Sequence, residues 1–306
     1  MSKTAADFAK WEVKDLVQFD DTAGGLVRCN IHTPLARALV YLQGAHVALF
    51  QPVGSEPVLF LSRQSHFAPG KPIRGGVPVC FPWFGPLAGR PDAPMHGFAR
   101  TMEWDLESVT VAPSAEVDLA LSLAASDATR AQWPHDFLLR HVIQIGAGLS
   151  MTLIVENRGA EPFTIEEALH TYLAVGDVRE VAVTGLEHTT FLDKADGLKT
   201  KSLTGEPLRF TGETDRVFPG HRAACAIDDP VLRRRLLVEK SGSGTTVVWN
   251  PWTAKAAAMA DFGDDEWPRM LCIETANTGA NAVTVAPGAQ HTMRATVGAG
   301  RMKDEG

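Results

Sequence analysis

Three short segments of this sequence place a group capable of acid–base chemistry among apolar neighbours, and RMLCIETAN (residues 269–277) is the first. If this segment is a strand, side-chain alternation puts Met270, Cys272 and Glu274 on one side of it. Glutamate is rarely buried without a partner or a function, because an ionised carboxylate loses its hydration there. Burial would also raise the pKa of Glu274 toward the working range of a general base. The alternative is a structural salt bridge to an arginine, and the segment alone leaves both open.

The other two segments carry histidines. In IEEALHTYL (residues 165–173), a strand would present His170 as an acid or a base if a carboxylate lay across a cavity from it. A lone histidine in a strand is more often a core residue with satisfied hydrogen bonds. In MHGFAR (residues 95–100), His96 precedes a glycine and Arg100 ends the segment. Spacing alone leaves this last segment equally open to a polar turn between strands.

A fourth stretch, IRGGVPVCFPWFGP (residues 73–86), joins a single arginine, Arg74, to a glycine pair and an apolar run. The prolines disfavour a central strand, because proline cannot donate to a hydrogen-bonded ladder. The apolar side chains are equally unsuited to an exposed loop. The stretch therefore predicts a loop clamped against a sheet.

Motifs for metals and nucleotides are missing from the sequence. No HxH, HExxH or CxxC pair occurs, and His135 and His141 have no acidic partner at metal-binding spacing. We therefore expect no metal and no cofactor. GSGTT (residues 242–246) is interpreted as a hairpin turn rather than as a phosphate loop. Four scattered cysteines are expected to be free thiols: Cys29, Cys80, Cys225 and Cys272.

Charge and hydropathy restrict the partners. With 29 basic and 36 acidic residues, the net charge of −7 argues against a nucleic-acid partner. The start of the chain lacks the apolar core of a signal peptide, and no apolar run approaches the roughly 18 residues of a membrane span. We expect a cytoplasmic protein without a membrane partner.

The elements that must position these residues have a period of two. Apolar residues alternate with polar or small ones along residues 117–124 and 149–156, as in half-buried antiparallel strands. Glycine-rich turns separate such runs, and only residues 126–133 and a turn at 264–267 suggest helix. The pattern predicts an all-β fold, a large antiparallel β-sandwich or barrel with few short helices. We expect one domain over residues 1–306, with a tail frayed from about residue 300, and a monomer.

Six segments occur in the order found in one family, and together they resemble the D-hexose-6-phosphate mutarotases, or glucose-6-phosphate 1-epimerases, of the aldose 1-epimerase superfamily. The resemblance extends from about Leu26 to Val297. It implies a galactose-mutarotase-like fold, a large twisted antiparallel β-sandwich whose concave face binds the sugar. It also implies a cofactor-free isomerase for the anomers of hexose 6-phosphates. The segments are IRGGVPVCFPWFGP, HGFAR, EEALHTYL, TDRVF, VVWNPW and DDEWPRMLCIETAN.

The resemblance also implies roles for single residues. Glu274 matches the family's general base, His170 its general acid, and His96 a residue that hydrogen-bonds the sugar and polarises the ring oxygen. Arg74 and Arg100 match the arginines that bind the substrate phosphate, for which planar guanidinium groups are suited. The glycine pair after Arg74 would let the backbone and the ligand approach closely.

Two further positions belong to the expected sugar site. Asp215 matches a residue that contacts the sugar, although a capped turn before Arg216 would explain it locally. Met95 stands where some members have a glutamine that contacts the substrate, so one polar contact is missing here. Two alternatives remain: an aldose 1-epimerase for unphosphorylated sugars, against which the two arginines argue, and a non-catalytic sugar-phosphate-binding protein.

Overall fold

The computed structural model describes residues 3–302, and β-strands account for most of its regular structure. The β20 sheet has eight strands: β15 (Lys199–Ser202), β14 (Thr190–Asp193), β16 (Thr214–Pro219), β19 (Thr245–Asn250), β20 (Met270–Asn277), β11 (Glu167–Leu169) and β5 (Val79–Cys80) in order, with β12 (Tyr172–Ala174) also on β20. The β9 sheet also has eight, in the order β13 (Ala182–Thr184), β17 (Cys225–Asp229), β18 (Arg234–Ser241), β22 (Gln290–Arg301), β9 (Leu149–Asn157), β8 (Phe137–Ile145), β7 (Val117–Ala124) and β6 (Asp105–Val111).

Two smaller sheets and a few helical turns complete the fold. Four N-terminal strands form a meander: β1 (Val17–Asp21), β2 (Val27–His32), β3 (Ala36–Tyr41) and β4 (His46–Pro52). The other small sheet pairs β10 (Phe163–Ile165) with β21 (Val283–Val285). The helices are α1 (Asp127–Arg130), α2 (Trp252–Ala257) and the 3₁₀ turns η1 (Ala5–Trp11), η2 (Ala99–Thr101), η3 (Lys194–Asp196), η4 (Trp267–Arg269) and η5 (Gly279–Asn281).

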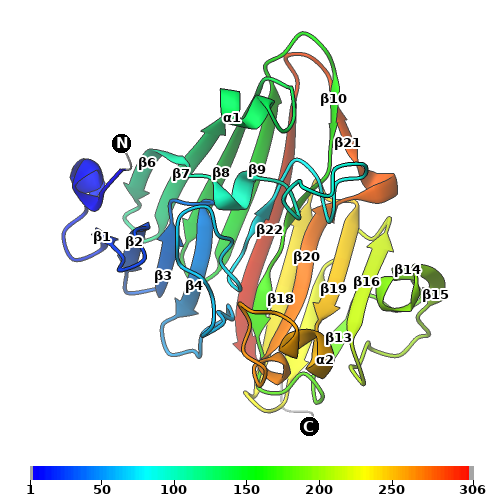
Figure 1. The fold of residues 1–306 in the computed structure, drawn as a ribbon. Helices are drawn as coiled ribbons and strands as arrows, with labels where there is room; N and C mark the ends of the chain where they lie inside the picture. Colours follow the sequence, from blue (N-terminus) through cyan, green and yellow to red (C-terminus); the bar gives the residue numbers. More distant parts are fainter. Residues whose placement is uncertain (1–2, 303–306) are drawn as a thin grey trace.

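The prediction of an all-β fold with antiparallel sheets is confirmed. Every ladder within the sheets is antiparallel, and Figure 1 shows β6 to β9 side by side and β16, β19 and β20 side by side. Strand β7 has the predicted bounds and buries Val117, Leu119 and Leu121, as the alternation required. Within the described residues, no helix is long and apolar enough to cross a membrane.

The main hydrophobic core joins one face of the β20 sheet to the β9 sheet. Leu271 and Ile273 of β20 belong to the same buried cluster as Leu121 of β7 and Leu153 of β9. The alternate residues of β20 point to the opposite face, yet all eight residues of the strand are buried. Other chain segments therefore cover that second face, which is where Glu274 lies.

The helix signal at residues 126–133 is confirmed in part. Helix α1 is shorter than the signal, and Ser126 caps it by accepting a hydrogen bond from Thr129 N. A turn at residues 264–266 leads into η4. All four cysteines are buried and unbridged.

The interpretation of residues 242–246 as a hairpin turn is wrong. Strand β18 pairs with β17 and β22, whereas β19 pairs with β16 and β20, so the segment joins two different sheets. Side chains hold this crossing in place: Ser243 donates to Ala276 O, and Asn277 accepts from Gly244 N. Turn composition could not reveal this, because glycine and serine suit either connection.

Strand pairing extends further into the C-terminal tail than expected. Gly300 and Arg301 lie in β22 and pair with Arg235 and Arg234 of β18. The rest of the predicted frayed tail, residues 303–306, lies outside the described residues.

Candidate active site

His170 and Glu274 face each other across neighbouring strands. Leu169 pairs with Thr275 and Tyr172 with Cys272, so the break between β11 and β12 lies opposite Glu274. His170 Nε2 is 3.3 Å from Glu274 Oε1. The carboxylate that the histidine needed is therefore its cross-strand partner on the same face of the β20 sheet.

The chain segment that follows Arg74 binds the backbone around the break at His170. The backbone N–H groups of His170 and Tyr172 donate to Pro78 O and Gly76 O, and β5 then pairs with β11. This arrangement confirms the prediction of a loop clamped against a sheet. It also brings the backbone of the arginine-bearing loop into direct contact with the strand that carries the histidine.

The glycine pair at positions 75 and 76 was expected to let a ligand approach the backbone, but its close neighbours are other parts of the chain. A Cβ on Gly75 would lie 2.5 Å from Phe60 O, and one on Gly76 would lie 2.3 Å from Val47 O. Both glycines also have positive φ angles, of 111° and 59°. They permit close packing of the loop on the protein's own backbone, rather than on a ligand.

A pocket of about 250 Å³ opens over this face of the β20 sheet. All seven residues predicted to form the site line it, although their roles stay predictions. The pocket is lined by Arg74, Phe84, Met95, His96, Arg100, His170, Tyr172, Lys194, Asp215, Val247, Trp249, Lys255, Met259 and Glu274.

Burial shifts the pKa values of the His170–Glu274 pair in opposite directions. Burial raises the pKa of Glu274 well above its usual value, and the nearby Asp215 raises it further. Burial lowers the pKa of His170 well below its usual value, and the neighbouring His96 and Arg100, which disfavour a second positive charge, act in the same direction. Glu274 Oε2 and His170 Nδ1 have no hydrogen-bond partner in the part of the chain that the structure describes. The two shifts together favour a neutral pair, in which the shared proton lies on Glu274 and His170 is uncharged.

His96 is held at the pocket wall with one ring nitrogen free. Gly85 N donates to His96 Nδ1 over 3.2 Å, which assigns the imidazole hydrogen to Nε2. Burial lowers the pKa of His96 to about 3, with Arg100 as the next cause, so the ring is neutral. A Cβ on Gly97 would lie 1.9 Å from Phe81 O, so only glycine allows this turn. The free Nε2–H of a neutral imidazole can donate to a ligand oxygen.

The two predicted phosphate-binding arginines differ in their surroundings. Arg74 donates from Nε and Nη2 to Asp261 Oδ2, at 3.2 and 3.1 Å, and from Nη1 to the Tyr172 hydroxyl at 3.1 Å. Arg100 donates from Nη2 to Met95 O at 2.6 Å, while its buried Nε has no partner. Within residues 3–302, Arg100 forms no ion pair with a carboxylate. The positive charge of Arg100 is therefore less well neutralised by the protein than that of Arg74.

Asp215 lies at the other end of the pocket beside two lysines. It pairs with Trp249 across β16 and β19, and its Oδ2 is 3.5 Å from Lys194 Nζ and 3.9 Å from Lys255 Nζ. Burial raises the pKa of Asp215, although the two lysines oppose the shift. Its carboxylate can accept hydrogen bonds from sugar hydroxyls.

Comparison with known proteins places the chain in a family. A profile of the aldose 1-epimerase family matches residues 29–297. This chain belongs to the aldose 1-epimerase family. Proteins described as "Putative glucose-6-phosphate 1-epimerase" from Escherichia coli K12 and Salmonella typhimurium are 40% and 39% identical to it over 243 and 242 residues. Each alignment covers 79% of this chain and 80% of the relative.

Solved structures agree with this assignment. The crystal structure of a protein described as a putative mutarotase from Salmonella typhimurium superimposes with a TM-score of 0.89 and is 33% identical. The superposition covers 95% of this chain and 96% of that one. The galactose-mutarotase-like fold expected for this aldose 1-epimerase is confirmed.

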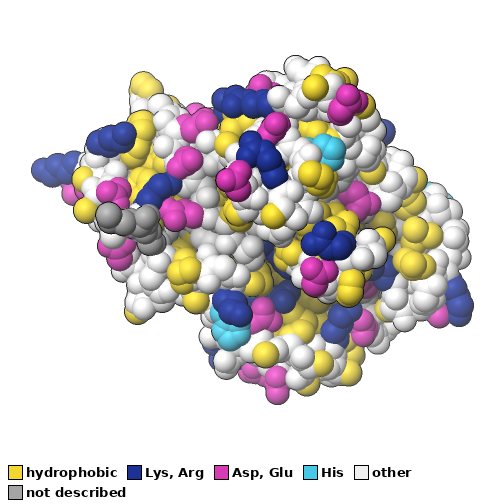
Figure 2. Space-filling view, turned by 45° about the horizontal axis from the view of Figure 1, so that its top comes forward, with side chains coloured by type: hydrophobic (Ala, Val, Ile, Leu, Met, Phe, Trp, Pro, Cys, Tyr) yellow, Lys and Arg dark blue, Asp and Glu magenta, His cyan; other side chains and the backbone are white. Residues whose placement is uncertain are grey.

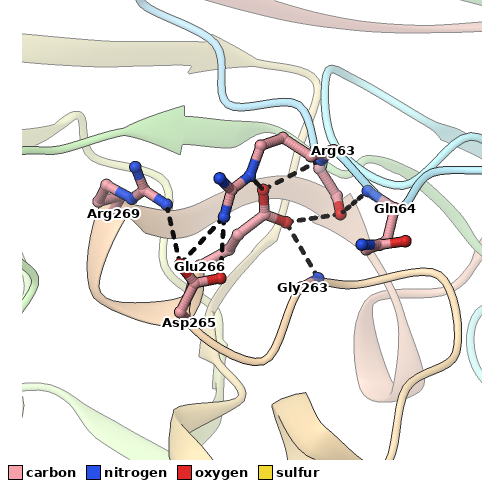
Figure 3. A network of polar contacts seen from close by, with 7 residues as sticks. Arg63, Gln64, Gly263, Asp265, Glu266 and Arg269 are labelled. Carbon is pink, nitrogen blue, oxygen red and sulfur yellow. Dashed lines mark hydrogen bonds and ion pairs between the residues drawn. The ribbon is translucent and has the colours of Figure 1, made fainter.

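A polar network supports the arginine-bearing loop of the epimerase (Figure 3). The buried Glu266 carboxylate accepts hydrogen bonds from Ser62 Oγ at 2.7 Å and Gly263 N at 3.0 Å. Ser62 N in turn donates to Arg74 O at 3.0 Å, and Gly263 follows Asp261 by two residues. Glu266 thus ties the backbone of Arg74 to the loop that carries the carboxylate partner of the arginine.

Several lining residues were not found from the sequence. Tyr172 lies two residues after His170, and strand alternation places both on one face, so this signal was present. Lys194 lies in the short turn η3, and Lys255 in α2, where nothing in the local sequence marks a site. On the face drawn in Figure 2, basic and acidic side chains are intermixed.

Proposed function

We propose that this aldose 1-epimerase interconverts the α and β anomers of D-glucose 6-phosphate and related hexose 6-phosphates. The observation that supports it best is the His170–Glu274 pair, 3.3 Å apart, in a pocket that also contains Arg74 and Arg100. The relatives at 39–40% identity carry the name of this activity.

The geometry of the pair suits the chemistry of a hemiacetal. In the proposed reaction the proton of the pair first moves from Glu274 to His170. Ionised Glu274 then takes the proton of the C1 hydroxyl, the C1–ring oxygen bond breaks, and protonated His170 donates its proton to the ring oxygen. C1 then presents its other face, and ring closure returns both protons by the reverse steps. Both reacting oxygens are bonded to C1, so a base and an acid must lie side by side, as Glu274 and His170 do.

His96 completes the acid–base arrangement in this proposal. Its Nε2–H is free to donate to the ring oxygen or to a neighbouring hydroxyl, which stabilises charge that develops on ring opening. Each proton that moves has a donor and an acceptor among the side chains of the pocket. The mechanism therefore assigns no step to a metal or a cofactor.

The charge of the pocket favours a phosphate ester over a neutral sugar. Three carboxylates, Asp215, Asp261 and Glu213, each pair with a lining cation, and the raised pKa of Glu274 favours its neutral form. Four cations minus three carboxylates leaves an excess of one positive charge, which favours an anionic phosphate ester over a neutral sugar. The four cations are Arg74, Arg100, Lys194 and Lys255.

Met95 in place of a glutamine changes the sugar contact but not the phosphate contact. Its side chain is 50% exposed at the pocket rim and cannot donate a hydrogen bond to a hydroxyl. Its backbone oxygen, however, accepts the hydrogen bond from Arg100, and any residue would supply that oxygen. We assign Met95 and Asp215 to sugar binding, and Met95 to the ranking of hexose epimers.

We also propose that the chain acts as a monomer with a single domain in the cytoplasm, without a nucleic-acid or membrane partner. The net charge of −7 supports the absence of a nucleic-acid partner. Size-exclusion chromatography with light scattering tests the monomer; a dimer would contradict it.

Exchange NMR tests the proposed activity. The rate of anomer exchange is compared for glucose 6-phosphate and free glucose at equal concentration, with Glu274→Gln protein as the blank. Faster exchange of the phosphate ester, lost in the blank, is the expected result. Equal exchange of both sugars would favour an aldose 1-epimerase for unphosphorylated substrates, and no exchange of either would favour a sugar-phosphate-binding protein.

A further inference from the structure

Tyr172 contacts both the phosphate subsite and the acid–base pair. Its hydroxyl accepts a hydrogen bond from Arg74 Nη1 at 3.1 Å. Its ring stacks on the His170 imidazole, with centroids 4.7 Å apart and an angle of 13° between the planes. One side chain thus links the arginine to the histidine.

The Tyr172 side chain has little freedom to move alone. It is 1% exposed, and its ring also meets the Trp249 ring edge-on at 5.8 Å. Its backbone N–H donates to Gly76 O, and its carbonyl accepts from Phe60 N, both at 2.9 Å. A shift of the phenol ring would therefore be passed to the imidazole it stacks on.

A phosphoryl group bound to Arg74 would affect the contact between Tyr172 and His170, because Arg74 is hydrogen-bonded to Tyr172. Its Nε and Nη2 already donate to Asp261, and its Nη1 donates to Tyr172. A dianion that draws on the remaining N–H groups fixes the guanidinium plane, and with it the Tyr172 hydroxyl. The dianion also offsets the positive charges of Arg74 and Arg100, which both lower the pKa of His170.

We propose that Tyr172 couples the phosphate subsite to the acid–base pair, so that a phosphoryl group bound at Arg74 accelerates ring opening as well as anchoring the sugar. This inference rests on the proposed function. Binding energy from a remote part of a substrate raises the rate of a chemical step when it is realised in the transition state. Tyr172 acts here as a positioning residue, through His170.

Dividing the substrate into two pieces tests the coupling. D-xylose is an aldose that forms a pyranose but lacks C6, and inorganic phosphite supplies a dianion without a sugar. The anomer exchange of xylose is measured by NMR with and without phosphite, and the ratio of the two rates is the activation factor. A merely structural residue would change both rates together and leave this ratio unaltered.

The chain offers a matched control, because its only other tyrosine is Tyr41. Tyr41 is also buried in a strand but does not line the pocket. We expect phosphite to accelerate exchange in the wild type and in Tyr41→Phe. In Tyr172→Phe the activation factor falls roughly tenfold or more, the scale of one hydrogen bond to a charged donor.

Each outcome has a distinct meaning. An activation factor in Tyr172→Phe equal to that of the wild type would overturn the role of Tyr172. Wild-type protein that exchanges glucose 6-phosphate, yet shows no phosphite activation of xylose, would mean that the phosphate only anchors, which also overturns the inference. Failure to exchange glucose 6-phosphate would instead count against the proposed function itself.

Discussion

Replacing Arg100 with methionine should weaken substrate binding and stabilise the free protein at the same time. Among residues 3–302 the buried Nε of Arg100 has no hydrogen-bond partner, and burial lowers the pKa of its guanidinium, so the charge is unfavourable in the pocket. Methionine retains most of the aliphatic stem without the charge. The guanidinium of Arg100, which we propose to bind phosphate, thus lowers the stability of the folded protein.

The magnitudes follow from the surroundings of the guanidinium. A hydrogen bond to a charged group contributes about 1.5–3 kcal/mol, so kcat/KM for glucose 6-phosphate should fall roughly 10- to 150-fold in Arg100→Met. A buried donor left without a partner costs about 1–3 kcal/mol, part of which the lost contact with Met95 O offsets. We therefore expect a net gain of about 1 kcal/mol and a Tm that is about 2 °C higher.

Exchange NMR and thermal unfolding check the two effects together. Arg28→Met is the matched control, because it breaks an ion pair with Asp20, at 2.6 Å, outside the pocket. The control should keep its kinetics and gain no stability, and Arg100→Lys should keep part of the phosphate affinity. If Arg100→Met instead lost stability and slowed exchange of free glucose as much as that of the ester, Arg100 would be a structural residue and the reasoning would fail.

Three further predictions concern the acid, the loop network and a distant ion pair. His170→Asn should slow anomer exchange by roughly 10²–10⁴-fold and remove one limb of the pH–rate profile; a profile of unchanged shape would exclude His170 as the acid. Glu266→Gln should raise KM for glucose 6-phosphate roughly tenfold and leave KM for free glucose unchanged. Asp229→Asn, which alters another buried carboxylate, should change neither KM. An equal rise in KM for both sugars in Glu266→Gln would refute the positioning role. The pKa of His291 is raised by its hydrogen bond to Glu167, so this pair stabilises the fold at low pH, and the stabilisation is lost as pH rises through the raised pKa. His291→Asn should therefore lower the free energy of unfolding more at about pH 5.5 than at about pH 8.5 in urea titrations, and a loss independent of pH would contradict this sign.

Strand periodicity predicted the fold class and part of the site, because it reports which face a side chain occupies. It gave β7 its bounds and placed Glu274 on the face opposite to Leu271 and Ile273. It could not give strand order, which depends on contacts between distant segments. That is why the connection at residues 242–246 was assigned to a hairpin although it joins two sheets.

The loop contribution to the site was less predictable than the sheet contribution. Asp261 pairs with Arg74 across 187 positions of sequence, and Lys194 reaches Asp215 from a 3₁₀ turn. No periodicity connects such residues, because loops have none. Only the resemblance to a family indicated that Arg74 and Arg100 share a site.

This difference suggests how chemistry and specificity are divided in the molecule. Glu274 lies on β20, and His170 lies between β11 and β12, which both pair with β20. The distance between acid and base therefore depends on a buried part of the sheet. Arg74, Arg100 and Lys194, which we propose to recognise the substrate, lie on loops and short turns around the pocket. Substitutions in these loops can change the preferred sugar while the acid–base pair stays in place. Tyr172 is the exception, because it belongs to a strand and yet contacts the phosphate arginine, and a change there should affect binding and chemistry together.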